Sequence, residues 1–69
     1  MKGLTDRQRE ILEFIGTFRK ENGYPPTYRE IQKDFGFGSI EAVHGHLRAL
    51  KAKGKVTWVP GSARTLREV

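Results

Sequence analysis

The side chains of this 69-residue chain that are best suited to chemistry gather in one short stretch, residues 39–48. If the stretch is helical, Glu41, Gly45 and Arg48 lie on one face, because each residue advances by about 100°. Arg48 can donate two hydrogen bonds to a guanine edge, and Glu41 can accept one from a cytosine amino group. His44 could reach a base or a phosphate. The pattern is typical of a helix face that recognises base edges.

Gly45 is unusual in the middle of such a face. A glycine costs about 1 kcal/mol relative to alanine in a helix interior, and an outward face offers no packing that would explain it. A partner that approaches the backbone closely would explain it, and the DNA major groove leaves little clearance around a helix. Ala42 could then contact a thymine methyl group. The alternative is a tolerated glycine, or one that packs against the first helix.

Metal binding and catalysis find little support in the sequence. His44 and His46 are two residues apart, whereas ligands that share a metal on one helix need a spacing of three or four. The chain has no cysteine, and no nucleophile lies beside a general base in any known motif. We therefore expect no metal, no cofactor, no small-molecule substrate and no enzymatic activity, and we expect His46 to lie at the edge of the core.

The net charge of +5 is concentrated in the last third of the chain. Positive and negative residues balance from residue 1 to residue 47, and Glu68 is the one acidic residue beyond that point. The cations there are Arg48, Lys51, Lys53, Lys55, Arg64 and Arg67. This asymmetry indicates a polyanionic partner. The chain shows neither a signal peptide nor an apolar run of about 20 residues, so we expect a cytoplasmic protein without a membrane partner.

Three helices are predicted to position these residues, at about 6–22, 28–35 and 40–53. Thr5 with Gln8 and Thr27 with Glu30 have the spacing of capping boxes, and Ser39 is a good N-cap for the third helix. Glycines follow each helix. The expected inward residues are Ile11, Leu12, Phe14, Ile15, Phe18, Ile31, Phe35, Ile40, Val43, Leu47 and Leu50. The short glycine-containing connection between the second and third helices predicts a helix-turn-helix.

A β-hairpin is predicted at about 55–68, and we call this segment the wing. Residues 56–59 are β-branched or aromatic, residues 60–63 have turn composition, and residues 65–67 could return as the partner strand. The hairpin should pack on the helices through Val56, Trp58 or Leu66. A flexible basic tail is the rival interpretation. The fold class is therefore mainly α with a small β-hairpin, a three-helix winged helix-turn-helix in one domain spanning 1–69.

A second group of residues is expected to contact the sugar-phosphate backbone rather than the bases. Helix N-termini attract phosphates, so Thr27 and Arg29 at the start of the second helix are expected to contact a phosphate. Ser39 is expected both to cap the third helix and to contact a phosphate. The remaining candidates lie at the start of the first helix, at the end of the third helix and on the wing: Arg7, Lys51, Lys53, Lys55, Ser62 and Arg64.

Several motifs resemble a known family. They are Leu4-Thr5-x-Arg7-Gln8, Gly23-Tyr24-Pro25-Pro26-Thr27, Arg29-Glu30-Ile31, Val43-His44-Gly45-His46-Leu47 and Lys53-Gly54. In this order and spacing they resemble the N-terminal DNA-binding domain of the LexA family of bacterial SOS-response repressors. The resemblance implies a domain that binds a palindromic operator as a dimer and represses DNA-damage genes. It also implies that Ser39, Glu41, Ala42, His44 and Gly45 read bases and that residues 55–64 grip the backbone.

The resemblance also sets expectations about what lies outside these residues. Family members continue into a self-cleaving peptidase domain that supplies most of the dimer interface, and the 69 residues contain none of it. We therefore expect an excised domain or a short stand-alone relative, of bacterial or phage origin, that is a monomer or weak dimer in solution. Residues 38–41 differ from the usual family pattern, which predicts a shifted base preference.

Two functions compete with operator binding. A winged helix can also serve as a protein-interaction module, in which the positive charge only aids solubility. A basic tail can bind nucleic acid or anionic membranes without sequence preference. Deleting the residues after Pro60 would abolish binding in that second case, while changes in the third helix would have no effect.

Overall fold

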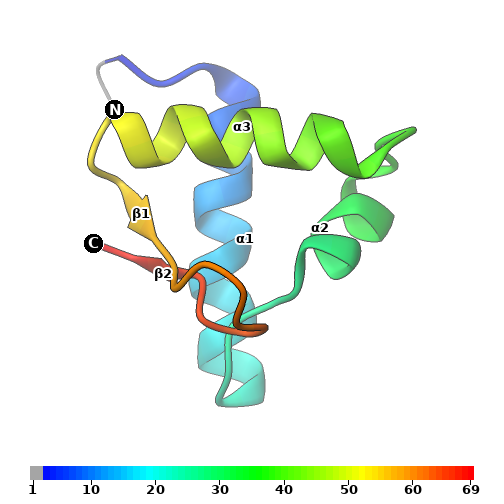
Figure 1. The fold of residues 1–69 in the computed structure, drawn as a ribbon, viewed down its shortest axis with the longest axis vertical. Coiled ribbons are helices and arrows are strands. Elements are labelled where there is room, and N and C mark those ends of the chain that lie inside the picture. The colour runs from blue at the N-terminus through cyan, green and yellow to red at the C-terminus, as the bar shows by residue number, and fades with distance from the viewer. Residues whose placement is uncertain (1–2) are drawn as a thin grey trace.

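The computed structural model describes residues 3–69, so the first two residues of the expected domain lie outside the described part. Three helices and one small antiparallel sheet make up this part (Figure 1). The elements are α1 (Asp6–Asn22), α2 (Tyr28–Phe35), α3 (Ile40–Ala52), β1 (Val56–Thr57) and β2 (Arg67–Glu68). The expected fold class, mainly helical with a small β-hairpin, is confirmed.

Both predicted capping boxes are formed. At the start of α1, the Thr5 hydroxyl accepts a hydrogen bond from the Gln8 amide (3.1 Å), and the Gln8 side chain accepts one from the Thr5 amide (3.1 Å). Thr27 and Glu30 make the same reciprocal pair at the start of α2 (3.2 and 2.8 Å). The glycines after α1 and α2 have φ angles of 79° and 70°. The ends of both helices therefore follow from local sequence.

The core lies where the three helices meet the wing. Its buried residues are between 0% and 7% exposed: Ile11, Leu12, Ile15, Ile31, Val43, Leu47, Leu50, Val56 and Leu66. The apolar stripes predicted for the helices thus face inward, with Phe14, Phe35 and Ile40 partly buried against the core. Because Val56 and Leu66 are buried from the wing, the wing is a packed element of the domain and not a flexible tail.

The wing differs from the predicted hairpin in the length and position of its strands. β1 and β2 have two residues each, paired as Val56 with Glu68 and Thr57 with Arg67. The strands expected at 56–59 and 65–67 are therefore confirmed only at 56–57 and at Arg67, and their expected lengths are wrong. The Thr65 hydroxyl accepts a hydrogen bond from the Val59 amide (2.9 Å) in place of a backbone ladder. Arg64 has a left-handed backbone (φ 55°), which cannot continue a strand. Residues 58–66 therefore form a loop closed by side chains.

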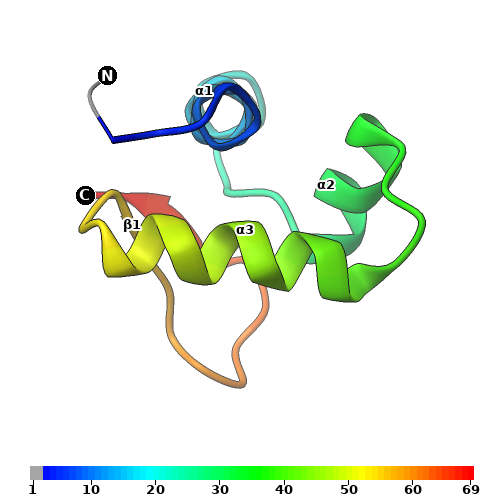
Figure 2. The same cartoon turned by 90° about the horizontal axis from the view of Figure 1, so that it is seen from above.

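α3 and the wing loop share one side of the molecule. In Figure 2, α1 is seen end-on above α3, and the orange loop that follows β1 projects below α3, on its opposite side. α3 packs on α2 and on β1, and α1 packs on β2. This arrangement leaves the outward side of α3 and the loop next to it free of the other helices.

Candidate nucleic-acid interface

The outward face of α3 is exposed as the sequence predicts. Glu41, Gly45 and Arg48 are all exposed. A Cβ atom built on Gly45 would have no neighbour within 4 Å outside its own helix. Packing against α1 is therefore ruled out as the reason for this glycine. On this face the Glu41 carboxylate and the Arg48 guanidinium lie on either side of Gly45, where the backbone is exposed.

His44 and Ala42 flank this face and are half-buried. The His44 ring stands edge-on to the Tyr28 ring, with 4.8 Å between the ring centroids and 78° between their planes. Burial raises the pKa of the Tyr28 hydroxyl, which stays protonated and can donate a hydrogen bond. The Tyr28 ring therefore restricts the direction in which His44 can point. By contrast, His46 stacks on Phe37 at 5.3 Å and lies at the edge of the core, as expected.

Ser39 occupies the N-cap position of α3 with an extended backbone (φ −152°, ψ 158°), but its side chain makes no capping hydrogen bond to the helix it precedes. The expected capping role of its hydroxyl is therefore wrong. The backbone conformation alone begins the helix, and Ser39 is exposed at its N-terminus. An exposed hydroxyl beside the positive end of a helix dipole suits a phosphate oxygen.

Two of the other candidates near helix starts are held within the protein. The Thr27 hydroxyl is engaged in the capping box of α2. The Arg7 guanidinium lies 5.6 Å from the Phe35 ring centroid and 5.5 Å from that of Phe37, and it pairs with Glu10 at 3.5 Å. Arg29, in the first turn of α2, is exposed. Within residues 3–69, its side chain forms neither an ion pair nor a hydrogen bond.

The lysines at the end of α3 also have partners. The Lys51 ammonium lies 4.5 Å from the centroid of the Trp58 ring. The Lys53 ammonium donates hydrogen bonds to the Gly3 carbonyl and to the Gln8 side chain (2.8 Å for the latter), so it ties the end of α3 to the start of α1. Within the described part of the chain, Lys55 has no side-chain partner, and Ser62 is exposed on the wing loop. Lys55 and Ser62 therefore remain the wing residues best placed for an external contact.

Arg64 is the candidate whose surroundings differ most from the expectation. Its guanidinium pairs with Glu30 at 3.0 Å and donates a hydrogen bond to the Pro25 carbonyl (3.0 Å). It also lies 4.5 Å from the centroid of the Tyr24 ring. A guanidinium with these partners is directed at the protein and not outward from the wing.

Sequence reasoning missed the aromatic contacts behind this surface. Tyr28 contacts His44 on one side and the Trp58 ring on the other, with 6.3 Å between the Tyr28 and Trp58 centroids. The three residues come from α2, α3 and the wing, so no short-range spacing could have indicated their contact. Next to them a pocket of about 340 Å³ lies between the wing loop and the N-terminus of α2.

Residues 3–69 contain neither a metal-binding cluster nor a membrane-spanning helix. That part of the chain holds no cluster of three histidine, cysteine, aspartate or glutamate residues suited to a metal ion. Its helices include none that is both long and apolar enough to cross a membrane.

An exposed helix of a helix-turn-helix, a neighbouring basic wing and a positive C-terminal third define a DNA-binding domain of the winged helix-turn-helix class. A family model described as the LexA DNA binding domain matches residues 1–65, and the chain belongs to that family. The LexA repressor of Pseudomonas chlororaphis is 48% identical over 67 residues, which are 97% of this chain and 33% of that protein. The LexA repressor of Halorhodospira halophila is 51% identical over 67 residues, 97% of this chain and 30% of that protein. The chain thus spans about a third of the length of these relatives.

Proposed function

We propose that this chain reads a palindromic SOS-type operator by placing α3 in the major groove, and that it represses the genes behind that operator. Membership in the LexA DNA-binding family supports sequence-specific binding of duplex DNA. The single observation that carries the groove geometry is Gly45, because its exposed backbone allows a closer approach than any other residue type would.

The base-contacting residues in this proposal are those of the outward and flanking faces of α3: Ser39, Glu41, Ala42, His44, Gly45 and Arg48. Arg48 would contact a guanine and Glu41 a cytosine, because bidentate donors and single acceptors match those edges. His44, restrained by Tyr28, would point along one direction only. The Ser39 hydroxyl would bind a phosphate or a base edge at the N-terminus of the helix.

The backbone contacts in this proposal are Arg29, Lys55 and Ser62, whose side chains are available, with Thr27, Lys51 and Arg7 at the margins of the surface. Two copies would bind the two half-sites, since a palindrome repeats the same contacts about a two-fold axis. Without DNA, the chain would be a monomer or a weak dimer. We place this activity in the cytoplasm of bacteria or of phage-infected bacteria, on the nucleoid.

The test is a titration of this chain against a palindromic SOS-type operator and a scrambled duplex of equal length, at two salt concentrations. We expect tighter binding to the palindrome and an affinity that falls steeply with salt for both duplexes. Equal affinities for the two duplexes would contradict sequence-specific reading. Weak, salt-independent binding to both would favour a protein-interaction module instead.

A further inference from the structure

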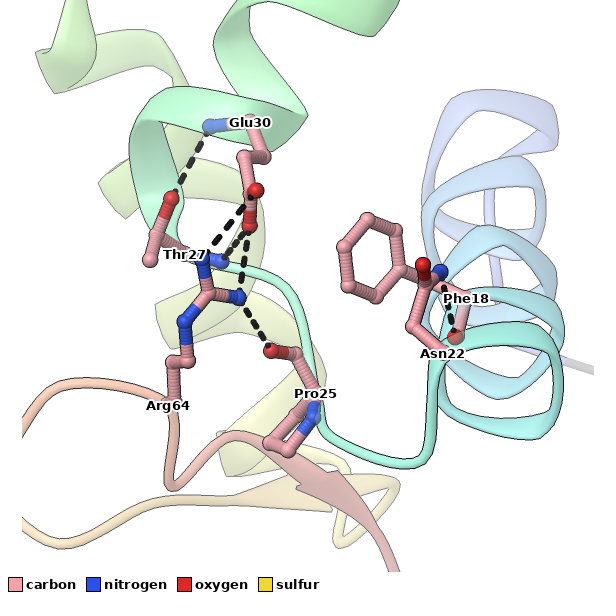
Figure 3. A network of polar contacts seen from close by, with 6 residues as sticks. All are labelled: Phe18, Asn22, Pro25, Thr27, Glu30 and Arg64. Carbon is pink, nitrogen blue, oxygen red and sulfur yellow. Dashed lines mark hydrogen bonds and ion pairs between the residues drawn. The ribbon is translucent and has the colours of Figure 1, made fainter.

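The Arg64 side chain is held by contacts with three residues, of which Figure 3 shows Glu30 and Pro25. One guanidinium nitrogen, Nη1, donates to Glu30 Oε1 and to the Pro25 carbonyl, both at 3.0 Å, and Nη2 donates to Glu30 Oε2 at 3.2 Å. The Tyr24 ring lies against the same group at 4.5 Å. A bidentate pair fixes the plane of the guanidinium as well as its position. The side chain therefore links the wing loop to the first turn of α2 and to the segment before it.

Glu30 takes part in two interactions at once. Its Oε1 accepts the Thr27 amide (2.8 Å), which begins α2, and the same carboxylate binds Arg64. The side-chain hydrogen bond from Arg64, followed by the backbone hydrogen bond from Thr27, lowers the pKa of Glu30. One carboxylate thus joins the first turn of α2 to the wing.

The backbone of Arg64 supports the same interpretation. Within residues 3–69 it is the one non-glycine residue with a positive φ angle (55°). Such a conformation is unfavourable for a residue with a Cβ atom, and it persists where surrounding contacts fix it. The guanidinium contacts act here together with the hydrogen bonds of the neighbouring Thr65 hydroxyl to Val59 and Ser62.

The tip of the wing needs such a link, although Val56 and Leu66 anchor its base in the core. Within the described residues, the hydrogen bonds of the exposed tip (60–63) go only to Val59 and Thr65 of the wing itself. Its strands have two residues each, and the pocket of about 340 Å³ separates the wing loop from the N-terminus of α2. Arg64 lines this pocket together with Arg29, Ser62 and Trp58. The pocket therefore lies between two groups proposed above as phosphate contacts, Arg29 on α2 and Ser62 on the wing.

From these contacts we infer that Arg64 is a positioning residue: through Glu30, Pro25 and Tyr24 it fixes the wing against α2, and so sets the separation between the phosphate-binding groups of the two elements. The inference rests on the proposed function in that these groups must contact DNA. Glu30 neutralises the charge of Arg64, so the side chain contributes preorganisation of the wing and not a phosphate contact. A wing that is already ordered loses less conformational entropy when DNA binds.

The test compares Arg64→Gln, Arg64→Lys and Glu30→Gln with the wild type in operator titrations over a series of salt concentrations. Gln at position 30 can still complete the capping box, so Glu30→Gln removes the ion pair without removing the helix start. Each variant should bind the operator on the order of 3- to 10-fold more weakly with an unchanged salt slope, because the wing must be ordered on binding. The double variant Glu30→Gln/Arg64→Gln should lose no more operator affinity than the single variant that binds more weakly, because both substitutions remove the same ion pair.

The opposite assignment gives opposite results. If Arg64 contacts a phosphate, Arg64→Gln flattens the salt slope by about one, and Arg64→Lys retains most of the affinity. Glu30→Gln then binds as well as the wild type or better, since a negative charge has been removed. Glu13→Gln, an exposed carboxylate on α1, is the control for the change in net charge alone. Either a flattened slope or tighter binding by Glu30→Gln overturns the inference.

A second measurement needs no DNA. In the free protein, ¹⁵N relaxation should show order parameters for amides 61–63 near those of the helices, about 0.85, and values falling toward about 0.6 in Arg64→Gln. The pKa of Glu30 should rise toward its ordinary value in that variant. An equally ordered wing in Arg64→Gln would refute the positioning role, whereas failure of the wild type to bind the operator would refute the proposed function alone.

Discussion

Replacing Gly45 by alanine separates the stability of the domain from its affinity for DNA. Gly45 lies inside α3 on an exposed face, and a Cβ atom there would meet nothing within 4 Å outside its own helix. The substitution should therefore recover the helix propensity that glycine lacks, about 1 kcal/mol. For a domain of this size that corresponds to a rise in Tm of about 4–8 °C.

The same methyl group should weaken binding to the operator. If α3 fits closely into the major groove at Gly45, the added Cβ must push the helix outward or displace its contacts, at a cost of about 1–3 kcal/mol. Thermal unfolding followed by circular dichroism measures the first effect, and a titration with fluorescently labelled operator measures the second. The expected variant is more stable and binds more weakly.

Gly16→Ala is the matched control, because Gly16 also lies inside a helix but away from α3. Its added Cβ would come within 2.7 Å of the Glu68 carboxylate, so that side chain must move and the gain in stability should be smaller. Operator affinity should not change. The reasoning is refuted if Gly45→Ala binds the operator as tightly as the wild type, or if it lowers Tm.

Four further predictions concern charged residues. Arg48→Ala should cost about 1–3 kcal/mol and relax specificity at one base pair, measured by titrating operators with single substitutions; equal losses on all sequences would make Arg48 a phosphate contact. Lys55→Ala should weaken binding to all sequences equally and flatten the salt slope by about one. Lys53→Met should chiefly lower Tm, because the loss of its hydrogen bond to Gln8 costs about 1 kcal/mol of stability. The pKa of Glu30 is lowered, so its stabilisation is complete above the ordinary carboxylate value of 4.5 and is lost as the pH falls through the lowered value. Acid titrations monitored by circular dichroism should therefore show a smaller loss of stability for Glu30→Gln than for the wild type.

The helices of this domain could be predicted because their limits depend on nearby residues. Thr27 and Glu30 are three positions apart, and the capping box they form needs nothing from the rest of the chain. The inward stripe of α3 follows from helical periodicity in the same way, and Val43, Leu47 and Leu50 are buried. The face that includes Gly45 lies away from that stripe and is therefore exposed.

The wing could not be predicted at the same level, because its conformation depends on contacts between distant residues. Arg64 and Glu30 are 34 positions apart, and their ion pair directs the arginine toward the protein rather than outward from the wing. Lys53 and Gln8 are 45 positions apart. In the sequence both cations look like free surface charges, and the fold alone assigns them partners.

The short strands of the wing affect how copies of the domain behave when they are crowded together. A long unpaired strand edge is a template for another chain and promotes aggregation, and very short edge strands are one of the ways in which proteins avoid it. β1 and β2 expose only two residues of edge each. Neighbouring copies therefore have little backbone onto which they could add a strand, which favours reversible assembly over irreversible self-association at high local concentration.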